Sequence, residues 1–567
     1  MNNVKKQCPY MEKCYRKNPI HFNEMLHPHL EKIVVNQLEG EIQIPEELDF
    51  ECSDRCLLKE QLKIVQMVLR NGRNSDGSSS STTNSLVNME SSSSSTGMSP
   101  MERLELCISI TSRSEIRERA IEIMKQQGME VSVVEPGNFG IKYALSAPYH
   151  LFLTRIQNSK ETYNQQFSIT FPEILDISLG EIVKSLHINF MVNVGWLCLQ
   201  YLLAGQRTDM SIVYGTRVDE GKVSSNITMI PVWIPTKFGC HHTKVMILKY
   251  KDDGIRVVVS TANLYSSDWK NRTQGVWISP HLPLLAESAN PSDGESPTGF
   301  KRDLEHYLHK YGKQALTEWI SVVRRANFSS VNVFFVASVP GRHTGVEYDY
   351  WGYRKLGHVL SKHAKLPPDA PQWTLIAQSS SIGNLGPNYE SWIQKEIISS
   401  MSKENPPGLK SYPNFRLIYP SLNNYEQSFD CRDGSSCLPY NIRMHSKQEW
   451  VESYMYQWKA TRTARDKAMP HIKTYTRISP NLDKIPWFVL TSANLSKAAW
   501  GIARNDSHHI YSYEAGVVFI PHFVTGSTTF PIKNEEDGVP VFPIPYDLPL
   551  TRYGSGDKPF VTEFLSR

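Results

Sequence analysis

The chain has 567 residues, which is too many for one ordinary hydrophobic core and predicts about two to four domains. Its composition, 40% hydrophobic and 21% charged, is that of a globular protein. A net charge of only +4 excludes a uniformly basic surface, so any basic binding surface must be local. Nine cysteines without a clustered framework indicate a reducing compartment, and the polar N-terminus carries no apolar signal-peptide run.

Three segments precede the main globular region. Residues 5–29 are dense in Cys, His and Tyr, and residues 30–70 have partly helical spacing. Residues 71–100 are Ser-rich and predict a disordered linker, because they have too few apolar residues to form a core. Residues 101–147 predict a short αβ segment, with a helix at 117–127 and a strand at 130–134.

From residue 148 onward, apolar β-branched runs alternate with helical ones, which predicts an α/β sandwich. The longest apolar stretch, 187–205, is interrupted by Asn189, Asn193 and Gln200, so it predicts a buried helix and not a membrane span. The expected strands are 245–248, 256–260, 331–337, 373–377, 415–419, 487–490 and 516–520, and the expected helices are 182–203, 354–363 and 390–401.

One unit of sequence occurs twice. Residues 260–269 and 491–500 share Ala, Asn, Leu and Trp at identical offsets, and a His-x-Lys triplet precedes each, at 242–244 and at 471–473. Residues i and i+2 of a strand share a face, so His and Lys are predicted to point together into one site, with Asn reaching it from a neighbouring strand. The two copies contribute His242, Lys244 and Asn263, and His471, Lys473 and Asn494.

This set of side chains suits phosphoryl chemistry. Lysines and amides can stabilise the equatorial oxygens of a pentacoordinate phosphorus. One neutral His can attack phosphorus while the other, protonated, donates to the leaving oxygen. Neither copy is expected to carry the nearby carboxylates of a magnesium site, so no cofactor is expected for catalysis. A lone His-x-Lys would be a chance pair on an exposed strand, but two matched copies favour the functional interpretation.

The duplicated motif resembles the phospholipase D superfamily, whose members carry two His-x-Lys motifs. Most members have an Asp after the Lys with four residues between, and here Lys249 and Ile478 occupy that position. This variant is similar to the tyrosyl-DNA phosphodiesterases, which release topoisomerase I remnants from DNA 3′ ends. The resemblance covers residues 148–567 and rests on the motifs at 238–244, 273–277, 380–386, 469–475, 491–501 and 542–549.

The resemblance implies an α/β fold of two phospholipase D-like α-β-α sandwich halves, 148–330 and 331–567, related by a pseudo-twofold axis. His242 would be the nucleophile that forms a phosphohistidine. His471 would protonate the tyrosine leaving oxygen and then activate water. Lys244, Lys473, Asn263 and Asn494 would bind the phosphate oxygens, and Gln274 and Glu514 would orient the histidines. The alternative interpretation of Glu514 is a carboxylate on a surface strand.

The resemblance also implies contacts to DNA. The loop 381–384 would offer backbone N–H groups and a hydroxyl to phosphates, and Phe238 would stack on a base. Asn384 stands where the family has Ser. The expected contacts are Phe238, Ser381, Ile382, Gly383, Asn384, Ser496 and Lys497, together with Lys244 and Lys473. The expected partners are single-stranded or duplex DNA 3′ ends and a phosphotyrosyl peptide derived from topoisomerase I.

The N-terminal segment has the spacing C-x5-C-x6-H-x5-H. A segment of about 22 residues cannot fold on apolar burial alone, and two Cys with two His suit one structural zinc. It resembles the poly(ADP-ribose)-binding zinc finger, although Met11 replaces the usual Gly. The expected zinc ligands are Cys8, Cys14, His21 and His27, and the resemblance implies that Tyr10, Tyr15 and Arg16 hold poly(ADP-ribose).

These motifs predict a DNA-repair phosphodiesterase, monomeric and nuclear, that poly(ADP-ribose) recruits to DNA breaks and that has no membrane partner. One alternative is a phospholipase D-type phospholipid hydrolase, which the missing motif Asp residues disfavour. A second alternative is a poly(ADP-ribose) reader with an inactive catalytic fold, which the intact His and Lys pairs disfavour.

Overall fold

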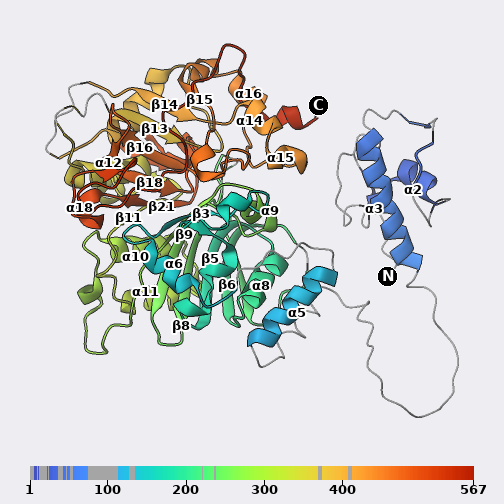
Figure 1. The fold of residues 1–567 in the computed structure, drawn as a ribbon, viewed down its shortest axis with the longest axis horizontal. Helices are drawn as coiled ribbons and strands as arrows, with labels where there is room; N and C mark the ends of the chain where they lie inside the picture. Colours follow the sequence, from blue (N-terminus) through green and yellow to red (C-terminus); the bar gives the residue numbers. More distant parts are fainter. Residues whose placement is uncertain are drawn as a thin grey trace, which may run out of the picture. The chain divides into compact units, whose positions relative to one another are not determined.

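The computed structural model (Figure 1) describes residues 113–126 and 135–566, apart from residues 220, 235, 237, 368, 370–372 and 406–410. Before residue 113 it describes residues 6–8, 11, 22, 25–35, 37, 42–45, 48–50 and 55–73. The chain divides into two compact units, Met1–Ser95 and Thr96–Arg567.

The first unit combines a short parallel strand pair with two helices. β1 (Lys6–Gln7) pairs with β2 (Met25–Leu26), followed by α2 (Pro28–Val34) and α3 (Arg55–Arg73). One small core joins these elements, so the segment 30–70 packs with the finger segment. The core residues are Phe22, Leu30, Val34, Ile42, Leu58, Leu62 and Val65. The expected linker begins inside α3, and its residues after 73 lie outside the described residues.

The second unit is built around two β-sheets. The first sheet has eight strands in the order β4-β3-β10-β9-β8-β5-β6-β7. Its strands are β3 (Leu151–Thr154), β4 (Ser168–Ile169), β5 (Ile182–Val192), β6 (Asp209–Arg217), β7 (Ile227–Pro231), β8 (Val245–Tyr250), β9 (Ile255–Ser260) and β10 (Gly275–Ile278). The accompanying helices are α5 (Arg113–Gln126), α6 (Phe139–Leu145), α7 (Phe171–Ile174), α8 (Val194–Leu203), α9 (Ser266–Lys270), α10 (Phe300–His309) and α11 (Thr317–Arg325).

The second sheet has seven strands in the order β11-β21-β18-β16-β13-β14-β15. Its strands are β11 (Phe334–Ser338), β13 (Thr374–Gln378), β14 (Phe415–Ile418), β15 (Met455–Tyr456), β16 (Thr474–Ile478), β18 (Phe488–Thr491) and β21 (Glu514–Phe519). Its helices include α12 (Gly352–His363), α13 (Ser399–Met401), α15 (Phe429–Arg432) and α17 (Lys497–Trp500). A small three-stranded sheet, β12 (Gly341–His343), β20 (Ser507–Ile510) and β19 (Ile502–Arg504), adjoins it in sequence.

The two sheets repeat one topology. Strands β3-β10-β9-β8-β5-β6-β7 correspond one by one to β11-β21-β18-β16-β13-β14-β15. Neighbours are antiparallel as far as β5 and β13, and parallel beyond them, in both sheets. In Figure 1 the first sheet, in green, lies below the second, in orange and red. The duplicated sequence unit therefore corresponds to a duplicated sheet, and the expected α/β class is confirmed.

Two expectations about local structure are wrong. Residues Ile182–Val192 of the expected helix form β5, and α8 begins only at Val194, where Asn193 Oδ1 accepts a hydrogen bond from Trp196 N at 2.8 Å. β5 lies inside the sheet between β8 and β6, and its residues 185–190 alternate between polar and apolar, which is the strand pattern that the helix prediction overlooked. The strand β16, which directly follows the second His-x-Lys, is not predicted, because its polar residues hide it.

Two further expectations need a comment. The expected helix 390–401 is helical, but its middle, Ile393–Ile398, is a π-helix. The expected strand at 130–134 lies outside the described residues.

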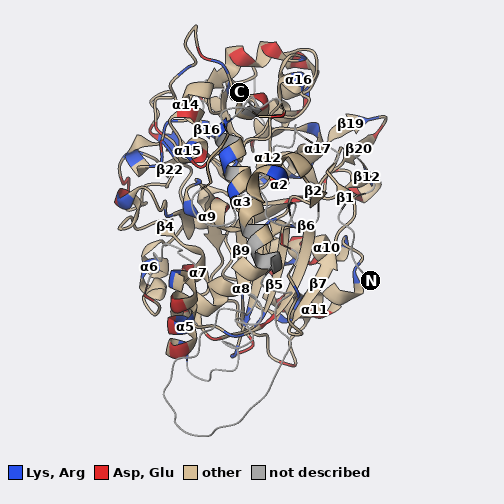
Figure 2. Ribbon diagram, turned by 90° about the vertical axis from the view of Figure 1, so that its right-hand side faces the viewer, with Lys and Arg blue, Asp and Glu red and all other residues tan. Residues whose placement is uncertain are grey.

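Within the part of the chain that the structure describes, no helix has the length and apolar character needed to cross a membrane. Basic and acidic residues are interspersed along the ribbon in Figure 2, in keeping with the small net charge.

Candidate active site

The two His-x-Lys triplets lie immediately before β8 and β16, and not within strands as predicted. Each is held by backbone of the other half. His242 N donates to Tyr513 O at 2.9 Å, and His471 N donates to Thr273 O at 3.0 Å. Tyr513 and Thr273 are followed directly by Glu514 and Gln274. The same backbone contacts therefore bring each orienting side chain to the histidine of the opposite half.

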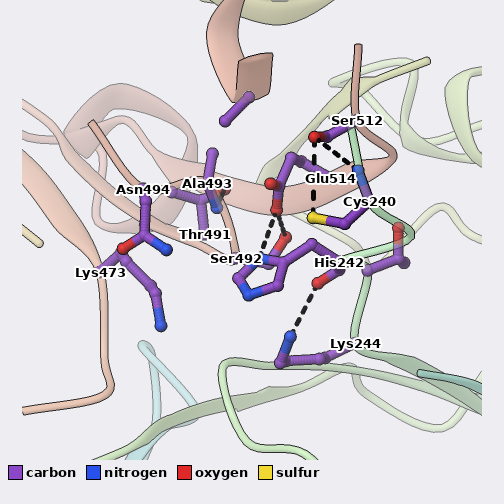
Figure 3. Close-up of polar contacts among 12 residues, drawn as sticks. Cys240, His242, Lys244, Lys473, Thr491, Ser492, Ala493, Asn494, Ser512 and Glu514 are labelled. Carbon is purple, nitrogen blue, oxygen red and sulfur yellow. Dashed lines mark hydrogen bonds and ion pairs between the residues drawn. The ribbon is translucent and has the colours of Figure 1, made fainter. Parts of the chain in front are cut away.

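His242 is paired with a carboxylate. Its Nδ1 lies 3.0 Å from Glu514 Oε2, and Ser492 Oγ donates to the same oxygen at 2.5 Å (Figure 3). Burial lowers the pKa of His242, Glu514 raises it, and Lys244 lowers it. The ring is therefore neutral near pH 7, with Nδ1–H donating to Glu514 and the Nε2 lone pair free to act as a nucleophile.

His471 has two oxygen acceptors at one nitrogen. Its Nδ1 lies 3.2 Å from Gln274 Oε1 and 3.3 Å from Asp268 Oδ2. Thr261 Oγ1 donates to Gln274 Oε1 at 2.9 Å, as Ser492 does to Glu514 in the other half. Burial, with the charge of Lys473, lowers the pKa of His471 to about 3 against the raising effect of Asp268. A bound phosphodiester adds the negative charge that favours its imidazolium form.

The two lysines are almost completely buried. Lys244 is 1% exposed and Lys473 is 0% exposed. Lys244 Nζ donates to His242 O at 2.8 Å, and Lys473 Nζ donates to His471 O. Burial lowers the pKa of Lys244 to about 8, and burial with the charge of Lys244 lowers the pKa of Lys473 to about 7. Two confined positive charges of this kind suit a phosphate oxyanion.

The structure holds the two motif asparagines in different ways. Asn494 Oδ1 accepts hydrogen bonds from Ser379 Oγ at 3.0 Å, Ser380 N at 3.2 Å and Ser381 N at 3.0 Å, which leaves its amide NH2 free to donate. Figure 3 shows Asn494 and Lys473 facing His242. Asn263 is 3% exposed, and its Oδ1 has no hydrogen-bond partner among the described residues. Its backbone N donates to Asp268 Oδ2 at 2.7 Å, and that oxygen lies 3.3 Å from His471 Nδ1, so all six motif residues lie at or beside one site.

Some expected DNA contacts are used inside the protein. Ser381 N donates to Asn494 Oδ1, and Gly383 N donates to Leu495 O at 3.0 Å. The prediction that the loop 381–384 offers these two N–H groups to phosphate is therefore wrong, and Ile382 is only 2% exposed. The loop instead holds Asn494. The hydroxyl of Ser381 and the exposed Asn384 are polar groups that the loop can still offer.

Other expected contacts lie near the surface. Phe238 is 79% exposed, and its ring packs edge-on against that of Tyr511, with 6.5 Å between the ring centroids. Ser496 Oγ accepts from Ala499 N at 3.1 Å and so caps α17, which leaves its own proton available. Lys497 is half-buried, and burial lowers its pKa. An exposed aromatic ring at this position suits stacking on a base.

Asp268 is a site residue that the repeated motif did not reveal. This carboxylate is 0% exposed and lies beside His471, so the first copy does place one carboxylate close to the motif residues. Asp268 stands just before the repeated Trp, where the second copy has Ala499, so it falls outside the pattern that the two copies share. In the part of the chain that is described, no group of three or more His, Cys, Asp or Glu side chains is arranged to hold a metal ion.

Comparison with known proteins identifies the family. The family model for "Tyrosyl-DNA phosphodiesterase" matches residues 150–554, and that for "PBZ domain" matches residues 5–30. This chain belongs to the tyrosyl-DNA phosphodiesterase family. The tyrosyl-DNA phosphodiesterase 1 of Drosophila melanogaster is 43% identical over 584 residues, which cover 99% of this chain and 100% of that protein. A probable tyrosyl-DNA phosphodiesterase of Caenorhabditis elegans is 32% identical over 407 residues, covering 69% of this chain and 84% of its own length.

Solved structures show that the fold is shared with this family. A crystal structure of a mutant yeast tyrosyl-DNA phosphodiesterase 1 superposes with a TM-score of 0.56 at 20% identity, over 73% of this chain and 99% of that one. Another crystal structure of the yeast tyrosyl-DNA phosphodiesterase gives a TM-score of 0.53 at 20% identity, over 72% of this chain and 99% of that one.

In this family member, half of the expected zinc ligands lie among the described residues. Cys8 and His27 are each 1% exposed, and Cys8 N donates to Leu26 O at 3.0 Å, which continues the β1–β2 pairing toward His27. His27 Nδ1 lies 3.2 Å from Met25 O, the kind of contact that orients a metal-binding imidazole. A buried thiol and imidazole brought to one end of a strand pair fit zinc. Cys14, His21, Tyr10, Tyr15 and Arg16 lie outside the described residues.

Proposed function

We propose that this chain hydrolyses the phosphodiester bond between a tyrosine and a DNA 3′ end, and other 3′-blocking adducts, through a covalent phosphohistidine. The observation that carries this proposal is that two buried histidines lie at one set of lysines and amides, and that their Nδ1 atoms have different hydrogen-bond partners. His242 Nδ1 is hydrogen-bonded to the carboxylate of Glu514, whereas His471 Nδ1 is hydrogen-bonded to the amide oxygen of Gln274. Such a pair can supply one nucleophile and one proton donor.

In the first step, Nε2 of neutral His242 attacks phosphorus and the P–O bond to tyrosine breaks. Lys244, Lys473 and the amides of the two motif asparagines stabilise the charge on the equatorial oxygens. His471, protonated in the complex, gives its proton to the departing phenolate oxygen. A phenol with a pKa of about 10 is a far better leaving group than the 5′ hydroxyl of an intact strand, so an unbroken strand is not cleaved.

In the second step, the now neutral His471 takes a proton from water as the oxygen of that water attacks the phosphohistidine. The P–N bond breaks, a DNA 3′ phosphate leaves, and His242 returns to its neutral form. Glu514 keeps the proton of His242 on Nδ1 throughout, so Nε2 faces phosphorus in both steps. Gln274 gives His471 the corresponding orientation.

The proposed partners follow from the surface around the site. Phe238 stacks on a base of a single-stranded or duplex 3′ end, and the hydroxyl of Ser381 with Lys497 contacts the next phosphate. The leaving tyrosine belongs to a peptide derived from topoisomerase I. The halves 148–330 and 331–567, related by a pseudo-twofold axis, form one monomeric catalytic unit, which acts in the nucleus.

In the N-terminal unit, Cys8, Cys14, His21 and His27 hold a structural zinc, and Tyr10, Tyr15 and Arg16 hold poly(ADP-ribose). Zinc supplies the fold of this segment and takes no part in the hydrolysis. A binding module tethered to the catalytic unit raises the local concentration of the enzyme at poly(ADP-ribose)-marked breaks. In the full-length protein, a zinc chelator and Arg16→Ala should each abolish retention on poly(ADP-ribose), and unchanged retention of both would contradict this assignment.

A paired substrate assay tests the catalytic proposal. The purified full-length protein should release tyrosine from a 3′-phosphotyrosyl oligonucleotide, leave a 3′ phosphate, and release no product from phosphatidylcholine vesicles. Hydrolysis of phosphatidylcholine without cleavage of the oligonucleotide would favour a phospholipid hydrolase. Turnover of neither substrate, with poly(ADP-ribose) binding intact, would favour an inactive reader.

A further inference from the structure

A chain of buried charged side chains ends at the Nδ1 atom of His471. Asp268 Oδ2 lies 3.3 Å from His471 Nδ1, and Arg272 Nη1 donates to Asp268 Oδ1 at 2.8 Å. The other face of Arg272 is bound by Asp430, whose two carboxylate oxygens lie 3.1 and 3.0 Å from Arg272 Nε. Asp268, Arg272 and Asp430 are 0%, 3% and 2% exposed. Four buried groups of alternating polarity therefore run from α15 of the second half, through the first half, to His471.

The two acceptors at His471 Nδ1 differ in what they can do. The amide oxygen of Gln274 accepts the Nδ1 proton whether the ring is neutral or charged, so it sets the tautomer and the ring orientation. A carboxylate at nearly the same distance also stabilises the extra positive charge of the imidazolium. His242 needs no such help as an acid, because its part in the reaction is that of a neutral nucleophile.

We propose that Asp268 is a positioning residue that sets the proton affinity of His471, and that Arg272 keeps its carboxylate charged. This inference rests on the proposed role of His471 as the proton donor to the leaving oxygen. It separates two tasks at one histidine: Gln274 orients the ring, while Asp268 makes the ring able to carry the proton that the leaving tyrosine needs.

The charges around His471 leave this task to Asp268. Lys473 and Lys244 both oppose its imidazolium, and Asp268 is the carboxylate in ion-pair contact with it among the described residues. Burial raises the pKa of Asp268, but His471 and Arg272 outweigh this effect and hold that pKa well below its usual range. Burial raises the pKa values of Tyr265 and Cys437, which face the same Arg272–Asp430 pair, so both stay neutral. Asp268 Oδ2 also accepts from Asn263 N at 2.7 Å, which fixes its position.

The test compares two leaving groups on the full-length protein. Asp268→Asn should slow the single-turnover release of tyrosine from a 3′-phosphotyrosyl oligonucleotide about 10²-fold, because the general acid is weakened. A 3′-(4-nitrophenyl phosphate) oligonucleotide needs little protonation of its leaving group, so its release should slow less than about fivefold. The descending alkaline limb of tyrosine release should shift to lower pH by about one unit or more, because removing the anion lowers the pKa of His471 in the complex.

Asp430→Asn is the matched control, since it removes the other carboxylate on Arg272 and does not touch His471. Its ratio of nitrophenol to tyrosine release should stay within about threefold of that of the unchanged protein. The double variant Asp268→Asn with Gln274→Glu, which returns a carboxylate to His471 Nδ1, should restore tyrosine release in part. Equal slowing on both substrates, or the same ratio change in Asp430→Asn, would overturn the inference and assign Asp268 a structural role.

Two outcomes keep this test separate from that of the proposed function. An unchanged protein that cleaves neither oligonucleotide would contradict the proposed function, whatever the variants do. If Asp268→Asn does not fold, as judged by its thermal transition, Gln274→Met decides instead. With Asp268 still present, its ratio of nitrophenol to tyrosine release should match that of the unchanged protein, and a tenfold rise would transfer the task to Gln274 and overturn the inference.

Discussion

The two halves of the catalytic unit share a strand order and a motif, yet their histidines have different neighbours. His242 is held by the carboxyl group of Glu514, and His471 by the amide of Gln274 with Asp268 beside it. In both halves the hydroxyl one residue before the Ala-Asn pair, Thr261 or Ser492, donates to the orienting side chain. Duplication therefore supplies a symmetric set of lysines and amides, and the few residues that break the repeat give the two histidines the different neighbours that the proposed mechanism uses.

The contacts between the halves are also crossed. Glu514 belongs to the second half and orients His242 of the first, whereas Gln274 belongs to the first half and orients His471 of the second. The backbone bonds of His242 to Tyr513 and of His471 to Thr273 cross in the same way. Neither half holds a complete site, so the comparison is tested by substituting the site residues of each half in turn.

The largest effect is expected at the nucleophile. His242→Ala removes the atom that we propose attacks phosphorus, so cleavage of a 3′-phosphotyrosyl oligonucleotide should fall by about 10⁴-fold or more, with no covalent adduct. The measurement is single-turnover cleavage followed on a denaturing gel. Activity within tenfold of the unchanged protein would show that the two histidines do not divide the tasks as described.

A smaller loss is expected at the partner of the nucleophile. Glu514→Gln should slow adduct formation by about 10²-fold, because the amide still holds the ring but no longer offsets the developing charge on His242. Ser492→Ala, which removes only the hydroxyl on Glu514, should cost less, about threefold to tenfold. An equal loss in both variants would indicate that the segment is disturbed as a whole.

The site residues could be predicted from the sequence more fully than the strands on which they are placed. The six motif residues could be found because two copies repeat them at matched offsets. Asp268 could not be found in this way, since Ala499 takes its place in the second copy. β5 was mistaken for a helix although its residues 185–190 alternate between polar and apolar as in a strand, since buried polar residues such as His187 are not expected between β8 and β6. β16 was missed for the same reason, because polar residues such as Arg477 lie buried in it. The internal use of the Ser381 and Gly383 N–H groups depends on Asn494 and Leu495, which are distant in sequence.

The second orienting residue should matter less than the first. Gln274→Met should slow turnover by about tenfold or less, because Asp268 still accepts from His471 Nδ1. Comparing its rate with that of Glu514→Gln under the same conditions measures the asymmetry of the halves directly. A loss larger than that of Glu514→Gln would reverse the comparison.

The smallest effect is expected on substrate affinity as a function of pH. A lysine carries its charge below its pKa, and burial lowers the pKa values of Lys244 and Lys473 to about 8 and about 7. A 3′-phosphorylated oligonucleotide should therefore bind several-fold more weakly at pH 9 than at pH 7, by up to about tenfold for each lysine that loses its charge. Fluorescence anisotropy can measure this, with an oligonucleotide that ends in a 3′ hydroxyl as the control. Equal pH dependence for both oligonucleotides would place the titrating groups elsewhere.

The unequal roles of the two histidines are tested most directly by the covalent adduct itself. His471→Asn removes the group that we propose activates water, while it leaves His242 and Glu514 in place. On a 3′-nitrophenyl phosphate oligonucleotide, which needs little help from an acid, this variant should accumulate a protein–DNA adduct visible on a denaturing gel. The added change His242→Ala should abolish that adduct. An adduct that persists without His242, or a His471→Asn protein that turns over without accumulating one, would contradict the account.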